Sequence, residues 1–225
     1  MAKFKKRQTI DVMLGTGIVP VFYDADPEVA LDVLKACYAG GIRVFEFTNR
    51  GEMAHDVFRK LIVSANDICP DLILGVGTVL DAPTAALYIQ LGANFVVGPN
   101  FNPEVARLCN RRGVPYSPGC GSVTEICDAM EYGCDIIKVF PAGNVGGPSF
   151  VKNVLAPLPW ANLMVTGGVE PTEENIRAWA GSGVACVGMG SKLFPEKEVH
   201  DKAWEAISER CGESLRIFRE SKKLF

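Results

Sequence analysis

The chain has 225 residues, 48% of them hydrophobic and 22% charged, which is the composition of a folded protein and excludes a disordered one. Its formal net charge is −3, so it has no basic field for nucleic acid or for an anionic membrane surface. No apolar run reaches the roughly 18 residues of a transmembrane helix, and no apolar segment of a signal peptide follows the basic N-terminus.

Eight short apolar runs alternate with helix-length segments along the chain. A leading helix is expected over Phe4–Leu14 and a long final helix over Asp201–Lys222. The eight runs have the length and composition of buried strands and comprise Ile18–Phe22, Val44–Thr48, Leu72–Gly77, Phe95–Gly98, Val114–Ser117, Asp135–Phe140, Leu163–Gly167 and Ala185–Gly190.

Helix signals lie between these runs. Asp26 and Pro27 suit the N-cap and first position of a helix that Gly40-Gly41 ends, and Pro103 begins another. This regular alternation predicts one α/β domain over residues 1–225, a single (β/α)8 TIM barrel with an N-terminal helix. A doubly wound open sheet is the alternative. The active site of a barrel lies at the C-terminal ends of its strands, so the candidate residues are sought there.

The second run carries polar residues on one of its two faces. Strand alternation puts Glu46, Thr48 and Arg50 on the face opposite Phe45 and Phe47. A carboxylate inside a barrel can transfer protons, and the planar guanidinium of Arg50 at the strand end can hold a substrate carboxylate. A structural ion pair of Glu46 is the alternative.

Three of the runs that end in glycine carry candidate binding groups. Gly75 and Gly77 allow the backbone to approach a ligand closely, and the Thr78 hydroxyl follows them. Gly167-Gly168 and Gly190-Ser191 end the seventh and eighth runs, where barrels often bind phosphate through backbone N–H groups.

The sixth run contains Lys138, the only lysine in any expected strand. Alternation places Ile136, Lys138 and Phe140 on one face, while Ile137 and Val139 suit packing beneath helices, so Lys138 is expected to point into the barrel. Burial there disfavours the ammonium form, and the neutral amine is the nucleophile that forms imines with carbonyl compounds. A lysine held by a carboxylate as a plug of the barrel is the alternative.

Cysteine and histidine residues give no sign of a metal site or a disulfide framework. The two histidines, His55 and His200, are isolated and are read as surface residues of helices. The eight cysteines include no C-x-x-C pair and are expected to be small buried hydrophobes in a reducing cytoplasm. They are Cys37, Cys69, Cys109, Cys120, Cys127, Cys134, Cys186 and Cys211.

With these residues in order, the sequence resembles the KDPG/KHG aldolase family, which comprises 2-keto-3-deoxy-6-phosphogluconate and 4-hydroxy-2-oxoglutarate aldolases. The likeness covers nearly the whole chain. It is carried by Glu46-Phe47-Thr48-x-Arg50, Gly75-x-Gly77-Thr78-Val79-Leu80, Lys138-x-Phe140-Pro141-Ala142 and Thr166-Gly167-Gly168.

The resemblance implies a class I aldolase of carbohydrate metabolism, in the Entner–Doudoroff route, that releases pyruvate and glyceraldehyde 3-phosphate. It implies Lys138 as the imine-forming residue, Glu46 as the general acid/base and Thr166 beside the reacting groups. Arg50 and Thr78 would bind the pyruvate carboxylate. The other implied substrate contacts are Phe140, Gly167, Gly168, Gly190 and Ser191. The resemblance also implies a homotrimer, a 2-keto acid as the small-molecule partner, and no cofactor or metal.

Some positions depart from the family pattern and leave the aldehyde product open. Gly98-Pro99-Asn100-Phe101 stands where many relatives have Ser-Pro-Gly, Gly143 replaces the usual glutamate, and Met189 replaces a glycine. A 4-hydroxy-2-oxoglutarate aldolase giving glyoxylate, a phosphogalactonate aldolase and an aldolase for an unphosphorylated keto acid remain alternatives. A phosphate-binding isomerase or epimerase without an imine, and a non-catalytic barrel, are alternatives from other classes.

Overall fold

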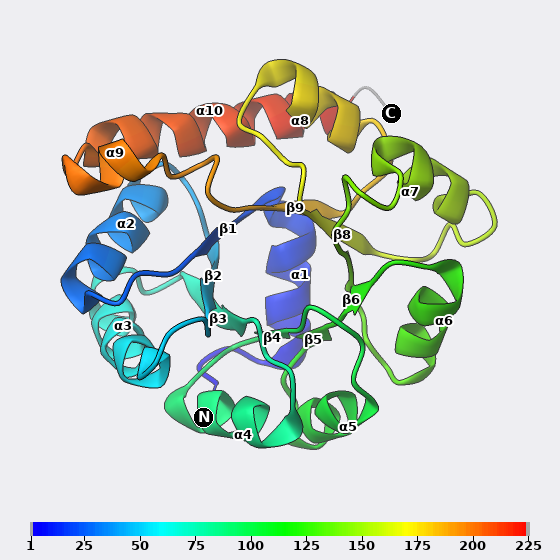
Figure 1. Ribbon diagram of the computed structural model, residues 1–225, viewed down its shortest axis with the longest axis horizontal. Coiled ribbons are helices and arrows are strands. Elements are labelled where there is room, and N and C mark those ends of the chain that lie inside the picture. The colour runs from blue at the N-terminus through cyan, green and yellow to red at the C-terminus, as the bar shows by residue number, and fades with distance from the viewer. Residues whose placement is uncertain (1, 224–225) are drawn as a thin grey trace.

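The computed structural model describes residues 2–223, in which parallel strands surround a central axis and helices cover their outer side (Figure 1). The strands are β1 (Ile18–Phe22), β2 (Val44–Thr48), β3 (Ile73–Gly77), β4 (Val96–Val97), β5 (Tyr116–Ser117), β6 (Gly119–Cys120), β7 (Ile137–Val139), β8 (Leu163–Thr166) and β9 (Cys186–Met189). They form one sheet in the order β5-β4-β3-β2-β1-β9-β8-β7-β6. The bounds of β1 and β2 agree with the predicted runs, whereas β4 and β7 are shorter than predicted.

Helices follow most strands. They are α1 (Lys6–Thr16), α2 (Pro27–Ala39), α3 (Ala54–Ile68), α4 (Ala82–Leu91), α5 (Pro103–Arg112), α6 (Val123–Glu131), α7 (Gly147–Leu155), α8 (Glu173–Ala180), α9 (Glu196–His200) and α10 (Trp204–Lys222). The predicted cap of α2 is present, since the side chain of Asp26 accepts a hydrogen bond from the backbone of that helix. Ser122 caps α6 in the same way. The predicted final helix, Asp201–Lys222, is present as α10 and begins three residues later than predicted. The short helix α9 before it was not predicted, and Lys202 lies between the two helices at φ 55°.

β5 and β6 are the two ends of the sheet, and only Pro118 separates them in the chain. Together they form a single strand position that closes the barrel. On one side Ser117 pairs with β4, and on the other Gly119 pairs with Lys138 of β7. The carbonyl oxygen of Pro118 accepts a 2.9 Å hydrogen bond from the Lys138 N–H. The nine strands therefore occupy eight positions around the axis, and the predicted (β/α)8 barrel is confirmed.

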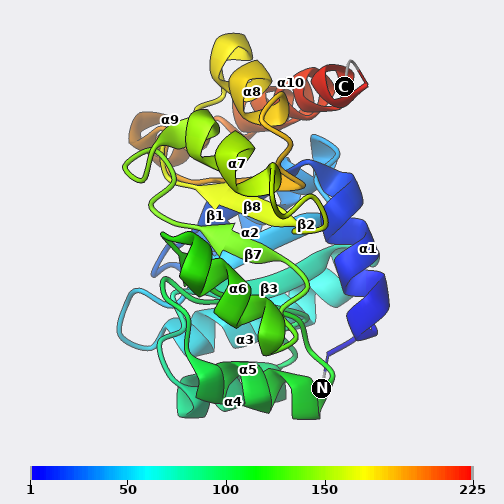
Figure 2. The same ribbon diagram turned by 90° about the vertical axis from the view of Figure 1, so that its right-hand side faces the viewer.

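Apolar side chains form a layer on each side of the sheet. The inner cluster fills the barrel with Met13, Val19, Val44, Ile73, Phe95, Val97, Ile136, Met164 and Cys186. The outer cluster joins the strands to the helices and contains Phe45, Phe47, Ile137 and Val139. Because α1 contributes Met13 to the inner cluster, the leading helix closes the end of the barrel at which the strands begin, as Figure 2 shows.

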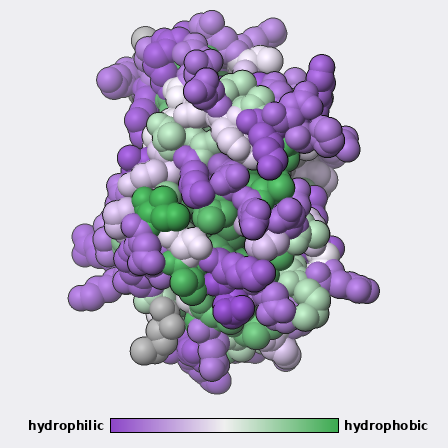
Figure 3. Space-filling view, turned by 90° about the vertical axis from the view of Figure 1, so that its left-hand side faces the viewer, coloured by the Kyte–Doolittle hydropathy of each residue, from purple (hydrophilic) through white to green (hydrophobic). Residues whose placement is uncertain are grey.

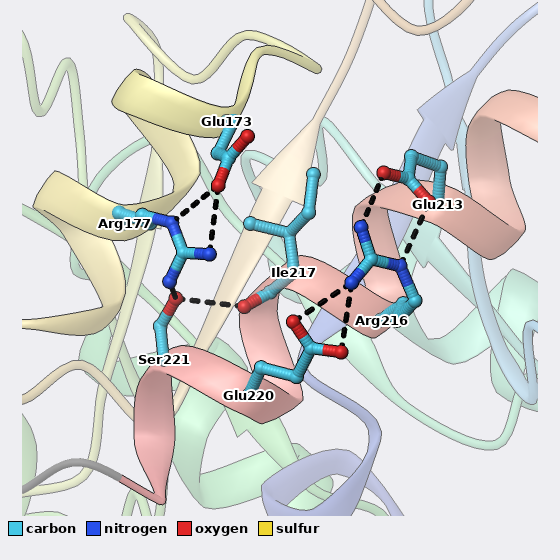
Figure 4. A network of polar contacts seen from close by, with 7 residues as sticks. All are labelled: Glu173, Arg177, Glu213, Arg216, Ile217, Glu220 and Ser221. Atoms are coloured by element: carbon cyan, nitrogen blue, oxygen red, sulfur yellow. Dashed lines mark hydrogen bonds and ion pairs between the residues drawn. The ribbon is translucent and has the colours of Figure 1, made fainter.

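A polar contact joins α8 to α10 in the helical layer (Figure 4). Arg177 of α8 donates to Glu173 at 2.8 Å and to the Ser221 hydroxyl of α10 at 3.4 Å. On the side of the barrel shown in Figure 3, apolar groups break an otherwise hydrophilic surface, and Val63 of α3 is 58% exposed. Within residues 2–223, no helix is both long and apolar enough to cross a membrane.

Candidate active site

Strands β2 and β7 direct two charged side chains into the barrel. Glu46 follows the inner residue Val44 by two positions, and Lys138 follows the inner residue Ile136 in the same way, as strand alternation requires. Lys138 is 5% exposed and Glu46 is 1% exposed. The predicted inward orientation of both residues is therefore confirmed.

The two charged groups face each other without a tight hydrogen bond. Lys138 Nζ lies 3.9 Å from Glu46 Oε1, and Glu46 Oε2 has no hydrogen-bond partner among the described residues. Burial raises the pKa of Glu46, an effect that the positive charges of Lys138 and Arg50 only partly oppose. A fully satisfied structural ion pair would hold the carboxylate charged, so this geometry suits proton transfer better than a plug.

Glycine at position 77 provides the space for this carboxylate. A Cβ atom there would lie 1.8 Å from Glu46 Oε1, so no larger residue fits without displacing Glu46. Gly77 is opposite Thr48 in the β2–β3 register, two pairs beyond Glu46 and Gly75. The glycine predicted to allow a close approach of ligand thus makes room for a side chain of the site.

Thr166 provides a further polar group at the end of β8. Its Oγ1 is buried and has no hydrogen-bond partner among residues 2–223. A Cβ at Gly188 of β9 would lie 2.3 Å from this oxygen, so Gly188 leaves the hydroxyl its place. An unsatisfied buried hydroxyl costs about 1–3 kcal/mol, and such a group is available to a substrate.

A cavity of about 850 Å³ opens at the C-terminal ends of the strands, the end facing the viewer in Figure 1. Of the predicted site residues, those lining it are Arg50, Phe140, Thr166, Gly167, Gly168, Gly190 and Ser191. Lys138 and Glu46 lie one layer deeper, two residues before Phe140 and Thr48, which also line the cavity. Phe140 packs beside the amine, with its ring centroid 5.0 Å from Lys138 Nζ.

Arg50 and Thr78 occupy neighbouring strand ends but differ in their position relative to the cavity. Arg50 is exposed and lines it, whereas Thr78 is half-buried and is absent from the lining. The Asn49 N–H donates to the carbonyl oxygen of Gly77 at 2.9 Å, which brings the two strand ends together. Thr78 has a φ of 62°, a strained conformation for a threonine, of the kind that often accompanies functional sites.

The glycine turns after β8 and β9 face the same cavity. Gly167 and Gly168 have φ of 91° and 81°, which glycine adopts without steric penalty. Lys192, after Ser191, lies with its Nζ 3.7 Å from Glu170 Oε1, an ion pair that links the two turns. This cavity end therefore combines backbone turns with the Lys192–Glu170 ion pair.

Several lining residues had not been identified from the sequence. They are Val21, Phe22, Tyr23, Asp24, Val29, Val169, Glu170, Gly188, Lys192, Phe194, Glu196, Val199, His200 and Lys202. Most lie in segments after β1, β8 and β9, whose path is set by the fold and not by a local motif. His200 is a surface residue as predicted and also lies at the cavity rim. Residues 2–223 contain no group of three potential metal ligands, and all eight cysteines are free.

Comparisons with known proteins relate this chain to aldolases. Residues 10–210 match the family model described as KDPG and KHG aldolase. The 2-dehydro-3-deoxy-phosphogluconate aldolase of Pseudoalteromonas atlantica is 34% identical over 215 residues, covering 96% of this chain and 97% of that protein. The protein of the same name from Treponema pallidum is 37% identical, covering 89% and 92%.

A solved structure is similar over the same extent. KDPG aldolase from Legionella pneumophila, crystallised with pyruvate captured at low pH as a covalent carbinolamine intermediate, has a TM-score of 0.81 and 30% identity. The match covers 89% of this chain and 95% of that one.

Proposed function

Because the chain belongs to the KDPG and KHG aldolase family, we propose that it is a class I aldolase that cleaves 2-keto-3-deoxy-6-phosphogluconate to pyruvate and glyceraldehyde 3-phosphate. The observation that carries this proposal is the buried pair of Lys138 Nζ and Glu46 Oε1, 3.9 Å apart beneath the cavity. A binding protein gains nothing from burying an amine beside a carboxyl group with an unsatisfied oxygen.

The reaction begins with attack of the Lys138 amine on the C2 carbonyl of the substrate. Loss of water gives a protonated imine, which accepts the electron pair of the C3–C4 bond when that bond breaks. Glu46, through one water molecule, takes the proton of the C4 hydroxyl as the aldehyde leaves. The enamine of pyruvate is then protonated at C3, and water releases pyruvate from Lys138. The raised pKa of Glu46 suits a group that must both accept and return a proton.

The two ends of the substrate have different partners in this proposal. Arg50 and Thr78 bind the carboxylate, which is supported by the exposed guanidinium at the cavity and by the adjacent strand ends. Thr166 offers its free hydroxyl beside the imine, and Phe140 packs against the reacting carbons.

The phosphate is proposed to bind at the opposite end, in the turns formed by Gly167-Gly168 and Gly190-Ser191. Both turns line the cavity, and Lys192, paired with Glu170, lies in the same region. Backbone N–H groups at such turns are frequent ligands of phosphate in barrel enzymes.

We further propose that residues 1–225 act as one aldolase domain in a cytoplasmic homotrimer, within carbohydrate breakdown of the Entner–Doudoroff type. The eight free cysteines fit a reducing compartment, and exposed apolar side chains support self-association. Those with large exposed fractions are Met53, Val63, Ile68, Leu80, Leu87, Val123 and Trp160. Light scattering tests this assembly, because a trimer has three times the 24.3 kDa mass of the chain.

Initial rates of pyruvate release test the proposed activity. The substrates are 2-keto-3-deoxy-6-phosphogluconate, its galactonate epimer, the two unphosphorylated acids and 4-hydroxy-2-oxoglutarate. We expect the highest kcat/KM with phosphogluconate, because remote binding energy of the phosphate can lower the barrier to cleavage. Equal or higher efficiency without phosphate would contradict the phosphate site and leave the imine chemistry standing.

A further inference from the structure

One backbone carbonyl in the turn after β8 is held by two side chains of α8. The carbonyl oxygen of Gly168 accepts a 3.1 Å hydrogen bond from Asn175 Nδ2 and another of 3.1 Å from Trp179 Nε1. The Oδ1 atom of Asn175 accepts a 2.9 Å bond from the Glu170 N–H, two residues further along the turn. Three hydrogen bonds thus attach residues 168–170 to one helix.

The two donors are themselves fixed. Asn175 and Trp179 are four residues apart and therefore lie on the same face of α8. The indole of Trp179 is 2% exposed, and the backbone N–H of Asn175 donates to the N-cap residue Thr172. Arg177, between them in sequence, joins α8 to Glu173 and to Ser221 of α10 instead (Figure 4).

The anchored carbonyl determines which groups of the turn face the cavity. In a trans peptide the C=O and N–H bonds point in opposite directions, so holding the Gly168 oxygen on α8 turns the Val169 N–H to the other side of the chain. Likewise, the Gly167 oxygen accepts a 2.9 Å bond from the Gly143 N–H, which fixes the direction of the Gly168 N–H. Gly167, Gly168 and Val169 all line the cavity.

Without this anchor the turn would have a ready alternative. Rotation of the Gly168–Val169 peptide changes ψ of Gly168 and φ of Val169. Because glycine tolerates a wide range of backbone angles, the peptide could rotate and present its carbonyl oxygen to the cavity. A carbonyl repels a phosphate that an N–H would bind. The hydrogen bonds from α8 therefore oppose the rotation that would weaken an anion site.

We infer that Asn175 and Trp179 are positioning residues for the phosphate end of the substrate, through the Gly168 carbonyl that both of them hold. This inference rests on the proposed aldolase function and assigns these two residues to substrate selectivity. Both side chains direct their hydrogen bonds to the turn after β8 and none to Lys138 or Glu46 among the described residues.

The test uses Trp179→Phe, which keeps an aromatic ring and removes the indole N–H, and Asn175→Asp, which keeps the acceptor for Glu170 and removes the donor. Arg177→Gln is the matched control on the same helix. The matched substrates are 2-keto-3-deoxy-6-phosphogluconate and 2-keto-3-deoxygluconate, which differ only in the phosphate. Inorganic phosphate is the probe of the isolated site, measured as an inhibitor of the phosphorylated substrate.

For each of the two turn variants we expect kcat/KM with the phosphorylated substrate to fall about tenfold, mainly through KM, because hydrogen bonds that serve a charged ligand have effects of this size. Inhibition by inorganic phosphate weakens by a similar factor. The unphosphorylated substrate and borohydride trapping of pyruvate change less than about twofold, and Arg177→Gln resembles the wild type in every assay.

Parallel losses with both substrates would show a merely structural role and overturn the inference, as would unchanged kinetics in both turn variants. A wild-type enzyme that traps pyruvate at Lys138 but does not distinguish the two substrates would also overturn it, with the imine chemistry intact. A wild-type enzyme without a trapped imine would instead contradict the proposed function.

Discussion

Two layers inside the barrel, separated by one step along the same strands, have opposite character. The lower layer is apolar and buried, whereas the layer above it carries a carboxyl group, an amine and a hydroxyl. The paired residues are Val44 and Glu46 in β2, Ile136 and Lys138 in β7, and Met164 and Thr166 in β8.

The difference teaches where this fold places stability and where it places chemistry. The lower layer and Met13 of α1 pack together as an ordinary core. The upper layer contains unsatisfied atoms of Glu46 and Thr166 and a carboxyl group whose pKa burial raises. Such groups weaken a fold, so their presence together in one layer of the barrel indicates a functional role. Substitutions in the two layers are expected to affect different properties.

Removing the amine of the upper layer has the largest expected effect. Lys138→Met keeps an unbranched side chain and abolishes imine formation, so kcat/KM for cleavage falls on the order of 10⁴-fold or more. Lys152→Met, at an exposed position of α7, is the matched control and retains wild-type rates. Substantial turnover by Lys138→Met would favour a barrel enzyme that works without an imine.

Removing the charge of the Glu46 carboxyl group has the second largest expected effect. We expect Glu46→Gln to lower turnover on the order of 10²-fold or more, because proton transfer at C4 is impaired, while pyruvate still forms a trappable imine. Single-turnover rates are compared with the extent of borohydride trapping. If both fell together, Glu46 would act on the lysine or on the fold and not as the general acid/base.

A substitution in the lower layer is expected to act on stability alone. Ile136→Val removes one buried methylene two residues before Lys138 and lowers the free energy of unfolding by about 0.5–1.5 kcal/mol. Denaturant unfolding measures this loss, and kcat/KM of the folded enzyme stays close to the wild type. A large loss of activity without a loss of stability would remove the distinction between the layers.

The smallest expected effect is the gain in stability when Glu46 of the upper layer is replaced by a residue that cannot ionise. Burial raises the pKa of Glu46 in the folded protein. The contribution of Glu46 to stability is therefore fully present below the pKa of an unfolded glutamate, and it is lost as the pH rises through the pKa of Glu46 in the folded protein. Glu46→Gln cannot ionise, so its Tm slightly exceeds that of the wild type at neutral pH, and the difference disappears below about pH 4. A lower Tm for Glu46→Gln at neutral pH would mean that the attraction of Lys138 outweighs burial.

The order of elements could be predicted because strand and helix patterns are local. Runs such as Ile18–Phe22 and Val44–Thr48 were predicted with the bounds that the structure has. Gly119–Cys120 was missed as a strand because two residues after a proline carry no periodicity, and only pairing with β7 makes them one. The short helix α9 was missed for a similar reason, since five residues carry little helical periodicity and the left-handed Lys202 that follows has no sequence signature.

The site could be predicted to the extent that alternation determines side-chain direction. The inward positions of Glu46 and Lys138 follow from it and are confirmed. Three other features depend on contacts between segments far apart in the chain. They are the distance between Glu46 and Lys138, the space that Gly77 leaves for Glu46, and the hydrogen bonds from α8 to Gly168. Asn175 and Trp179 gave no sign of a functional role in the sequence, because an asparagine in a helix is usually a surface residue and a tryptophan is usually a core residue. The roles of all these residues remain predictions.

The most direct measurement is identification of the lysine that binds pyruvate. The enzyme is incubated with pyruvate and borohydride, digested, and analysed by mass spectrometry for a reduced pyruvate adduct. The account predicts loss of activity together with one adduct per chain, located on Lys138, because among residues 2–223 it is the buried lysine and lies beside a carboxyl group with a raised pKa. An adduct on another lysine, or none from enzyme that is active in the same preparation, would contradict it.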